Sequence, residues 1–193
     1  MFHFLREVCS TKLLDTPPQL GGPGVVVQID ESLFNHKAKH NRGRRADNED
    51  ERWVFGLADT SFKPAITYME LVSKRDAATL LPIIRRIVRP GSIIYSDQWK
   101  AYHRIQDELN LEHATVNHSV NFVDPETGVH TQTIESYWAK AKYKLKEMKG
   151  VSSGALSSYL DERMWRDRWV ERGMMHTRTL FYTLLNNMLF KTL

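Results

Sequence analysis

Three carboxylates and one amine stand where they could act together in one site. Asp30 ends the run VVVQID, Asp97 ends the run SIIYSD, and Glu135 opens the segment ESYWAKAK, with Lys142 seven residues later. Seven residues make about two helical turns, so Glu135 and Lys142 share a face if this segment is helical. Carboxylates that repel one another can share a hard cation, and Mg²⁺ and Mn²⁺ favour such oxygen ligands. The acids therefore predict a divalent-metal site.

The pattern of apolar residues predicts the elements that position these side chains. Short runs rich in β-branched residues predict five strands, at 25–30, 53–59, 65–72, 92–96 and 113–118. Helical patterns are found within 1–20 and at 76–88, 100–109, 133–149, 152–172 and 179–190. Pro82 is expected in the first turn of its helix, or to kink it. A strand, a helical crossover and a further strand normally give parallel neighbours, so Asp30 and Asp97 are expected at the same edge of the sheet.

The helix that begins near Glu135 should bury one stripe and expose the next. The stripe expected to pack on the sheet is Ile134, Trp138, Ala141, Leu145 and Met148. The neighbouring stripe carries Glu135 with Lys142, Lys146 and Lys149, which could contact phosphates. The loop HKAKHNRGRR supplies three further candidates for DNA binding, Arg42, Arg44 and Arg45. The alternative for this loop is a solvated cluster balanced by the acidic run DNEDE at 47–51.

Composition limits the class of protein. The chain has 193 residues, of which 41% are hydrophobic, enough for one domain with a real core. Lys and Arg outnumber Asp and Glu by 27 to 23, and the pI of about 9.2 permits an anionic partner. The single Cys9 excludes an intramolecular disulfide and a multi-cysteine zinc site. Since no apolar run approaches about 18 residues, we expect neither membrane insertion nor export.

Several motifs, in order, resemble one known group of proteins. They are QIDES at 28–32, NRGRR at 41–45, WVFG at 53–56, LLPIIRRIVRPGSIIYSDQWKAY at 80–102, VNHSVNFVDPETGVHTQTIESYWAKAK at 116–142 and YLDERMWR at 159–166. Together they resemble the DDE transposases of the Merlin superfamily and the related bacterial insertion-sequence transposases. The resemblance implies an α/β, RNase H-like fold with a mixed five-stranded sheet flanked by helices. It places the catalytic domain at 21–172, between an N-terminal helical extension at 1–20 and a C-terminal helical tail at 173–193.

The same resemblance implies a mechanism. Asp30, Asp97 and Glu135 would be the catalytic residues and would hold two Mg²⁺ (or Mn²⁺) ions, which assist cleavage and strand transfer at transposon ends. Lys142 would contact a phosphate near the scissile bond. The partner would be double-stranded DNA, bound by a homo-oligomer, in the nucleus of a eukaryote or the cytoplasm of a bacterium. Family members usually carry a recognition region before the core, so the alternative is a domesticated DNA- or protein-binding protein without transposition activity. An RNase H-type ribonuclease fits the fold but not the motifs.

Each residue also has a structural interpretation. A lone Asp after a strand is commonly a turn or N-cap residue, and Glu135 alone would be an acid favoured by the helix dipole. Glu31 should point to the opposite side of its strand from Asp30. Asp59 and Asp124 are expected in turns, and the five tryptophans in core packing, with base stacking by Trp99 a minor alternative. His118 and His130 have two interpretations, as hydrogen-bonded structural histidines or as groups that orient a ligand or a phosphate.

Overall fold

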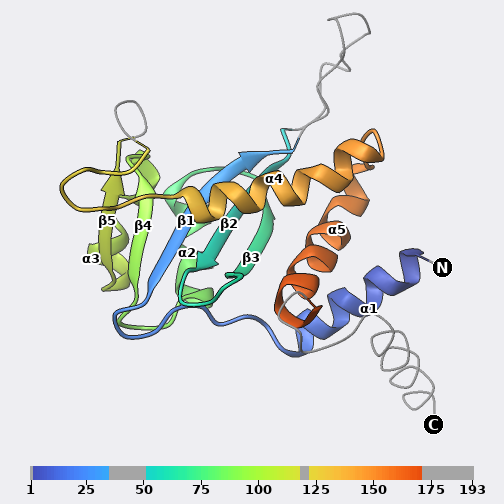
Figure 1. Cartoon of the computed structure of the whole chain (residues 1–193), viewed down its shortest axis with the longest axis horizontal. Coiled ribbons are helices and arrows are strands. Elements are labelled where there is room, and N and C mark those ends of the chain that lie inside the picture. Colours follow the sequence, from blue (N-terminus) through green and yellow to red (C-terminus); the bar gives the residue numbers. More distant parts are fainter. Residues whose placement is uncertain (1, 35–50, 118–121, 171–193) are drawn as a thin grey trace, which may run out of the picture.

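A twisted, mixed sheet forms the centre of the molecule (Figure 1). The computed structural model describes residues 2–34, 51–117 and 122–170. The strands are β1 (Val26–Leu33), β2 (Trp53–Asp59), β3 (Ile66–Val72), β4 (Ile93–Asp97) and β5 (Glu112–Val116). Their order is β3-β2-β1-β4-β5. The first three strands form an antiparallel meander, whereas β4 and β5 run parallel to β1.

Helices cover both faces of this sheet. They are α1 (Phe2–Asp15), α2 (Ala77–Ile87), α3 (Ile105–Leu109), α4 (Gln132–Glu147) and α5 (Ser153–Trp165). Two short turns complete the set, a 3₁₀ turn η2 (Lys100–Tyr102) and a π turn η3 (Arg166–Val170). The expected mixed five-stranded sheet flanked by helices is therefore confirmed.

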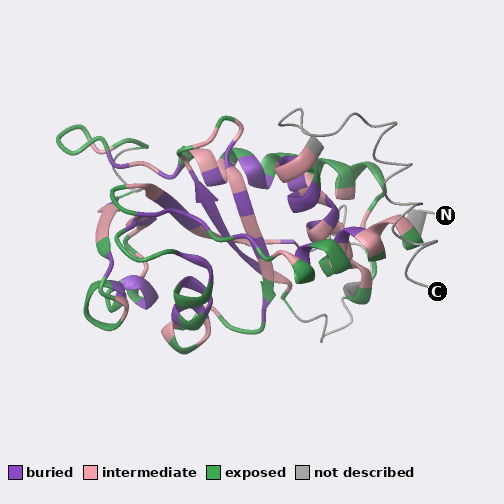
Figure 2. Cartoon of the chain, turned by 90° about the horizontal axis from the view of Figure 1, so that it is seen from below, coloured by how far each residue is buried: buried purple, intermediate pink, exposed green. Residues whose placement is uncertain are grey.

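Two hydrophobic cores lie on opposite faces of the sheet. One joins the sheet to α2 and α3 and contains Leu80, Ile84 and Ile105. The other joins it to α4, α5 and α1 and contains Trp138 and Leu156. Figure 2 shows the strands buried between helices whose outer surfaces are exposed. Alternate side chains of β2 serve different cores, Phe55 and Leu57 the first and Val54 and Ala58 the second, which fixes the register of this strand.

The structure corrects four local expectations. The predicted helix at 100–109 is divided into η2 and α3 by a turn at residues 103 and 104. Pro82 lies inside α2, beyond its first turn, so of its two expected effects only the kink stays a prediction. Helix α4 ends at Glu147, and Lys149 takes a left-handed conformation with φ of 58° before Gly150. Lys149 is therefore not on the helical stripe of Glu135, and Met148 is 38% exposed instead of buried.

Candidate active site at the carboxyl edge of strands β1 and β4

The parallel pairing of β1 with β4 brings two aspartates to one edge. The paired residues run from Val26 with Ile93 to Gln28 with Tyr95. Asp30 and Asp97 each lie two residues beyond the last pair. Because side chains alternate between faces, both aspartates are on the α4 face of the sheet, as Gln28 is. The expected shared edge is therefore observed.

Glu135 approaches this edge from the first turn of α4. Its charge reaches Asp30, whose pKa is raised to about 6, chiefly by burial and further by repulsion from Asp97 and Glu135. A hydrogen bond from Trp138 opposes this rise. Within the described residues, however, no three Asp, Glu, His or Cys side chains already form a closed metal-binding group. The three acids thus lie at one edge of the sheet, but their side chains are not yet close enough together to coordinate one ion.

Three contacts at regular intervals fasten α4 along β1. The Gln28 side chain accepts hydrogen bonds at the start of α4, the Trp138 indole N–H donates to Asp30 Oδ2 over 2.8 Å, and the Lys142 Nζ donates to Ser32 Oγ over 2.6 Å. Two residues of a strand advance about 6.6 Å, and four residues of a helix advance about 6.0 Å. The two repeats match closely, so the helix stays in step with the strand beside the acids.

Gln28 supplies the cap of α4 from the middle of the sheet. Its side chain is 1% exposed, and its Oε1 accepts from the backbone N–H groups of Thr133 at 2.9 Å and Ile134 at 3.2 Å. Its Nε2 lies 3.3 Å from Nδ1 of His130. Thr131, the residue before the helix, makes no capping bond and instead donates its hydroxyl to Glu135 Oε1 at 2.9 Å. Gln28 thereby frees Thr131 to orient the glutamate. No pattern in the sequence indicated this role of Gln28.

A glycine makes room for the bond between Trp138 and Asp30. Gly56 pairs with Asp30 across β1 and β2. A Cβ atom at Gly56 would lie 2.3 Å from the Trp138 ring, a distance at which one of the two must move. The buried Trp138, expected only to pack, therefore also holds a candidate catalytic residue in place.

Hydrogen bonds also hold Asp97 and Glu31. The backbone N–H of Trp99 donates to Asp97 Oδ1 at 2.9 Å. On the opposite face, Glu31 accepts a short hydrogen bond from the hydroxyl of buried Tyr102. Burial raises the pKa of Glu31 to about 7, although the Tyr102 bond opposes the rise. The expected separation of Glu31 from Asp30 is thus observed.

The predicted DNA-binding residues lie in different parts of the chain. Lys142 Nζ lies 5.0 Å from the ring centroid of Phe34, close to the end of β1, and Lys146 is exposed in the last turn of α4. Lys149 follows the helix and is exposed. Arg42, Arg44 and Arg45 lie outside the described residues, as does His118.

The remaining acids have structural roles. Asp59 accepts hydrogen bonds from the backbone of Gly21 and Ser61 at the end of β2. Asp124 accepts from the backbone N–H groups of Glu126 and Thr127, and these bonds lower its pKa. Both therefore stabilise turns, as the sequence indicated.

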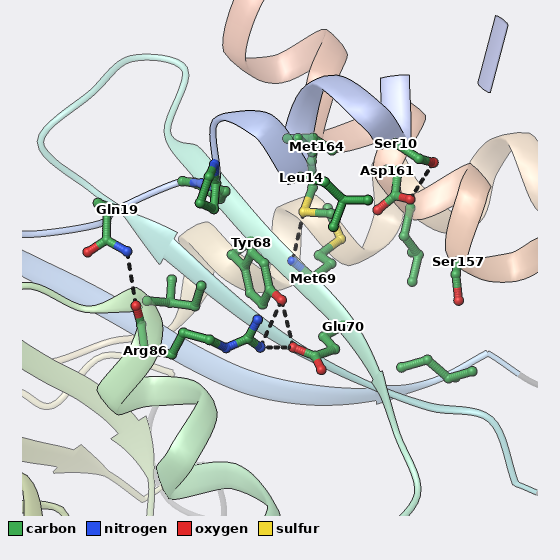
Figure 3. A pocket seen from close by; sticks show the side chains of 16 residues that line it. Ser10, Leu14, Gln19, Tyr68, Met69, Glu70, Arg86, Ser157, Asp161 and Met164 are labelled. Atoms are coloured by element: carbon green, nitrogen blue, oxygen red, sulfur yellow. Dashed lines mark hydrogen bonds and ion pairs between the residues drawn. The ribbon is translucent and has the colours of Figure 1, made fainter. Parts of the chain in front are cut away.

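A cavity of about 550 Å³ lies elsewhere, between α1, α5 and the edge strand β3 (Figure 3). Its wall includes Tyr68, Glu70 and Arg86, which are joined by hydrogen bonds and an ion pair. None of Asp30, Asp97 and Glu135 lines it. This cavity is therefore not the acidic site.

No helix in the described part of the chain combines the length and apolar character needed to cross a membrane.

Comparison with known proteins relates this chain to transposase domains. Residues 19–167 match the model of the ISXO2-like transposase domain. An uncharacterized transposase-like protein of Haemophilus influenzae is 34% identical over 99 residues, which are 51% of this chain and 78% of that protein.

Two solved structures have similar chain traces. The catalytic core domain of BIV integrase is 14% identical, with a TM-score of 0.49, over 87% of this chain and 98% of that chain. The HTLV-2 integrase catalytic core domain in complex with magnesium is 12% identical, with a TM-score of 0.45, over 75% and 86%. At these scores they add nothing to the fold assignment, which rests on the strand order. The Merlin part of the resemblance stays a prediction. By the match over residues 19–167, the chain belongs to the family of ISXO2-like transposase domains.

Proposed function

We propose that this chain is the catalytic core of a DDE transposase, which cleaves DNA strands and transfers them with the help of two Mg²⁺ or Mn²⁺ ions. The observation that carries the proposal is the convergence of Asp30, Asp97 and Glu135 from three separate elements on one sheet edge. Burial, and in addition repulsion from Asp97 and Glu135, raises the pKa of Asp30, and a bound cation would relieve this penalty on the charged carboxylate. The donors are all carboxylate oxygens, which suit these two metals.

Each residue then has a defined role. Asp30 and Asp97 are held by the N–H groups of Trp138 and Trp99, and Glu135 is held by the Thr131 hydroxyl, so the ligands are oriented before substrate arrives. When bound, the two ions activate the attacking oxygen and stabilise the leaving oxygen at phosphorus. Lys142 lies beyond Trp138 on the same helix, where its charge attracts a DNA phosphate. Double-stranded DNA is the proposed partner, bound by a homo-oligomer.

Nicking of supercoiled DNA with Mg²⁺ or Mn²⁺ tests this proposal. We expect Asp30→Asn, Asp97→Asn and Glu135→Gln to abolish cleavage, while affinity for DNA stays equal or rises because a negative charge has been removed. Asp124→Asn is the matched control, since the Asp124 carboxylate accepts hydrogen bonds from the backbone of its own turn. Cleavage that persists in any of the three site variants would exclude the assignment. Binding without any cleavage by the unaltered protein would favour the domesticated alternative.

A further inference from the structure

Arg75 lies against the rings of two tryptophans, one of which, Trp99, follows Asp97 by two residues. It lies in the loop that joins β3 to α2, and its guanidinium carbon is 3.6 Å from the ring centroid of Trp53 and 5.2 Å from that of Trp99. Both indoles are half-buried and pack against the core on the α2 face of the sheet. The cation is therefore held by rigid aromatic neighbours.

The same tryptophan anchors Arg75 and a candidate metal ligand. The Trp99 indole N–H donates to the Arg75 carbonyl at 3.1 Å, and the Trp99 backbone N–H donates to Asp97 Oδ1 at 2.9 Å. The position of Arg75 is thus fixed relative to the carboxylates.

Arg75 makes no ion pair within the described part of the chain, unlike several other arginines there. Arg86, Arg104, Arg163 and Arg166 each pair with an acid. The N–H groups of a guanidinium point outward in its plane. An aromatic ring against its face therefore leaves these N–H groups accessible to an acceptor with two oxygens. Carboxylates and phosphates both match this fork and charge, and the proposed DNA substrate supplies phosphates.

We propose that Arg75 binds a phosphate of the DNA substrate at the rim of the active site. The inference rests on the proposed function and adds to it a second point of contact. Lys142 stands on the α4 side of the sheet edge and Arg75 packs with residues of the α2 side, so the DNA backbone is gripped from both sides. The guanidinium already covers the Trp53 ring, which favours a phosphate over a stacked base as the occupant.

Salt-dependent binding tests the role of Arg75. The full chain is titrated with a short labelled duplex in EDTA, so that no metal-dependent cleavage occurs, over a series of salt concentrations. Arg75→Met keeps the aliphatic stem and removes the charge, whereas Arg75→Lys keeps the charge. Arg85→Met is the control, because Arg85 is exposed in the last turn of α2 and bonds only the Glu108 carbonyl. Thermal melting checks that each variant is folded, and Arg75→Gln replaces the Met variant if that one melts early.

The expected result is a log-log salt slope lower by about 0.9 in Arg75→Met, with the slope preserved in Arg75→Lys and Arg85→Met. An unchanged slope in Arg75→Met overturns the inference, and so does an equal loss in Arg85→Met. If affinity for single strands falls while the slope stays the same, the aromatic cluster binds a base and the phosphate role is wrong. Failure of the proposed function has a separate sign, which is the absence of metal-dependent nicking by the unaltered protein.

Discussion

At the scale of single residues, the acidic edge is organised by partners that carry no charge. Trp138, Thr131 and the backbone of Trp99 each donate one hydrogen bond to one carboxylate. Such donors orient an acid without neutralising it, so the negative charge stays available for a cation.

Metal binding should therefore stabilise the folded protein by linkage. At a free Mn²⁺ concentration of about 100 times Kd, one site adds about 2.7 kcal/mol. For a chain of this size that corresponds to a rise in Tm of about 5 to 10 °C. Thermal melting with and without Mn²⁺ measures the shift, which we expect to shrink in Asp97→Asn and to persist in Asp124→Asn. Equal shifts in both variants would place the ion elsewhere.

At the scale of elements, β1 and α4 form the unit that determines the site. Three residues on one face of β1 contact α4. Gln28 contacts the N-terminus of the helix, Asp30 contacts Trp138, and Ser32 contacts Lys142. The helix is therefore positioned both along the strand and about its own axis. A shift of α4 by one residue would break all three contacts at once.

Loss of the Gln28 cap should impair the position of Glu135 more than the stability of the fold. Gln28→Leu leaves the buried N–H of Ile134 and the partly buried N–H of Thr133 without their acceptor, at a cost of about 1 to 3 kcal/mol for the buried group. Tyr137→Phe is the matched control, because Tyr137 lies on the same helix as the Gln28 cap. This change removes the 2.7 Å hydrogen bond from the Tyr137 hydroxyl to the Ala65 carbonyl. We expect Gln28→Leu to raise the Mn²⁺ concentration needed for half-maximal nicking. Gln28→Glu, which keeps the acceptor oxygens, should restore it.

A purely structural role for Gln28 makes a different forecast. Gln28→Leu and Tyr137→Phe would then lower Tm by similar amounts and share the metal requirement of the unaltered protein. That outcome would contradict the positioning role.

The sequence predicted the strands of this unit but not the side-chain contacts that hold its helix in place. The β-branched runs located all five strands, and the crossover rule placed Asp30 beside Asp97. Periodicity reports only which face of an element is apolar, so it could not show that Gln28 pairs with a helix more than 100 residues away. Gly56 looked like an ordinary strand residue, because its need for a missing Cβ arises only when Trp138 packs on it. The end of α4 was misplaced because the apolar spacing continues to Met148 although the chain turns at Lys149.

At the scale of the whole molecule, the sheet separates two cores, and α1 belongs to the second one. Cys9 and Leu13 of α1 are buried in the same core as Leu156 and Leu160 of α5. Polar contacts also join the two helices, including the 2.6 Å bond from the Ser10 hydroxyl to Asp161. The segment expected to be a peripheral extension therefore contributes to the packing that supports α5, and α5 in turn packs on β3.

Neighbouring leucines in α1 allow this contribution to be measured. Leu13 is 7% exposed and Leu14 is 81% exposed, so their truncation differs in burial but hardly in helix propensity. Leu13→Ala should lower the free energy of unfolding by about 2 to 5 kcal/mol, because it leaves a cavity in the core beneath α5. Leu14→Ala should change it by no more than about 0.5 kcal/mol. Urea denaturation of the two variants measures the difference. Nicking rates at low temperature should be equal in both variants, since α1 contributes no residue to the acidic edge. Equal urea midpoints would contradict the prediction and show that α1 does not stabilise the fold.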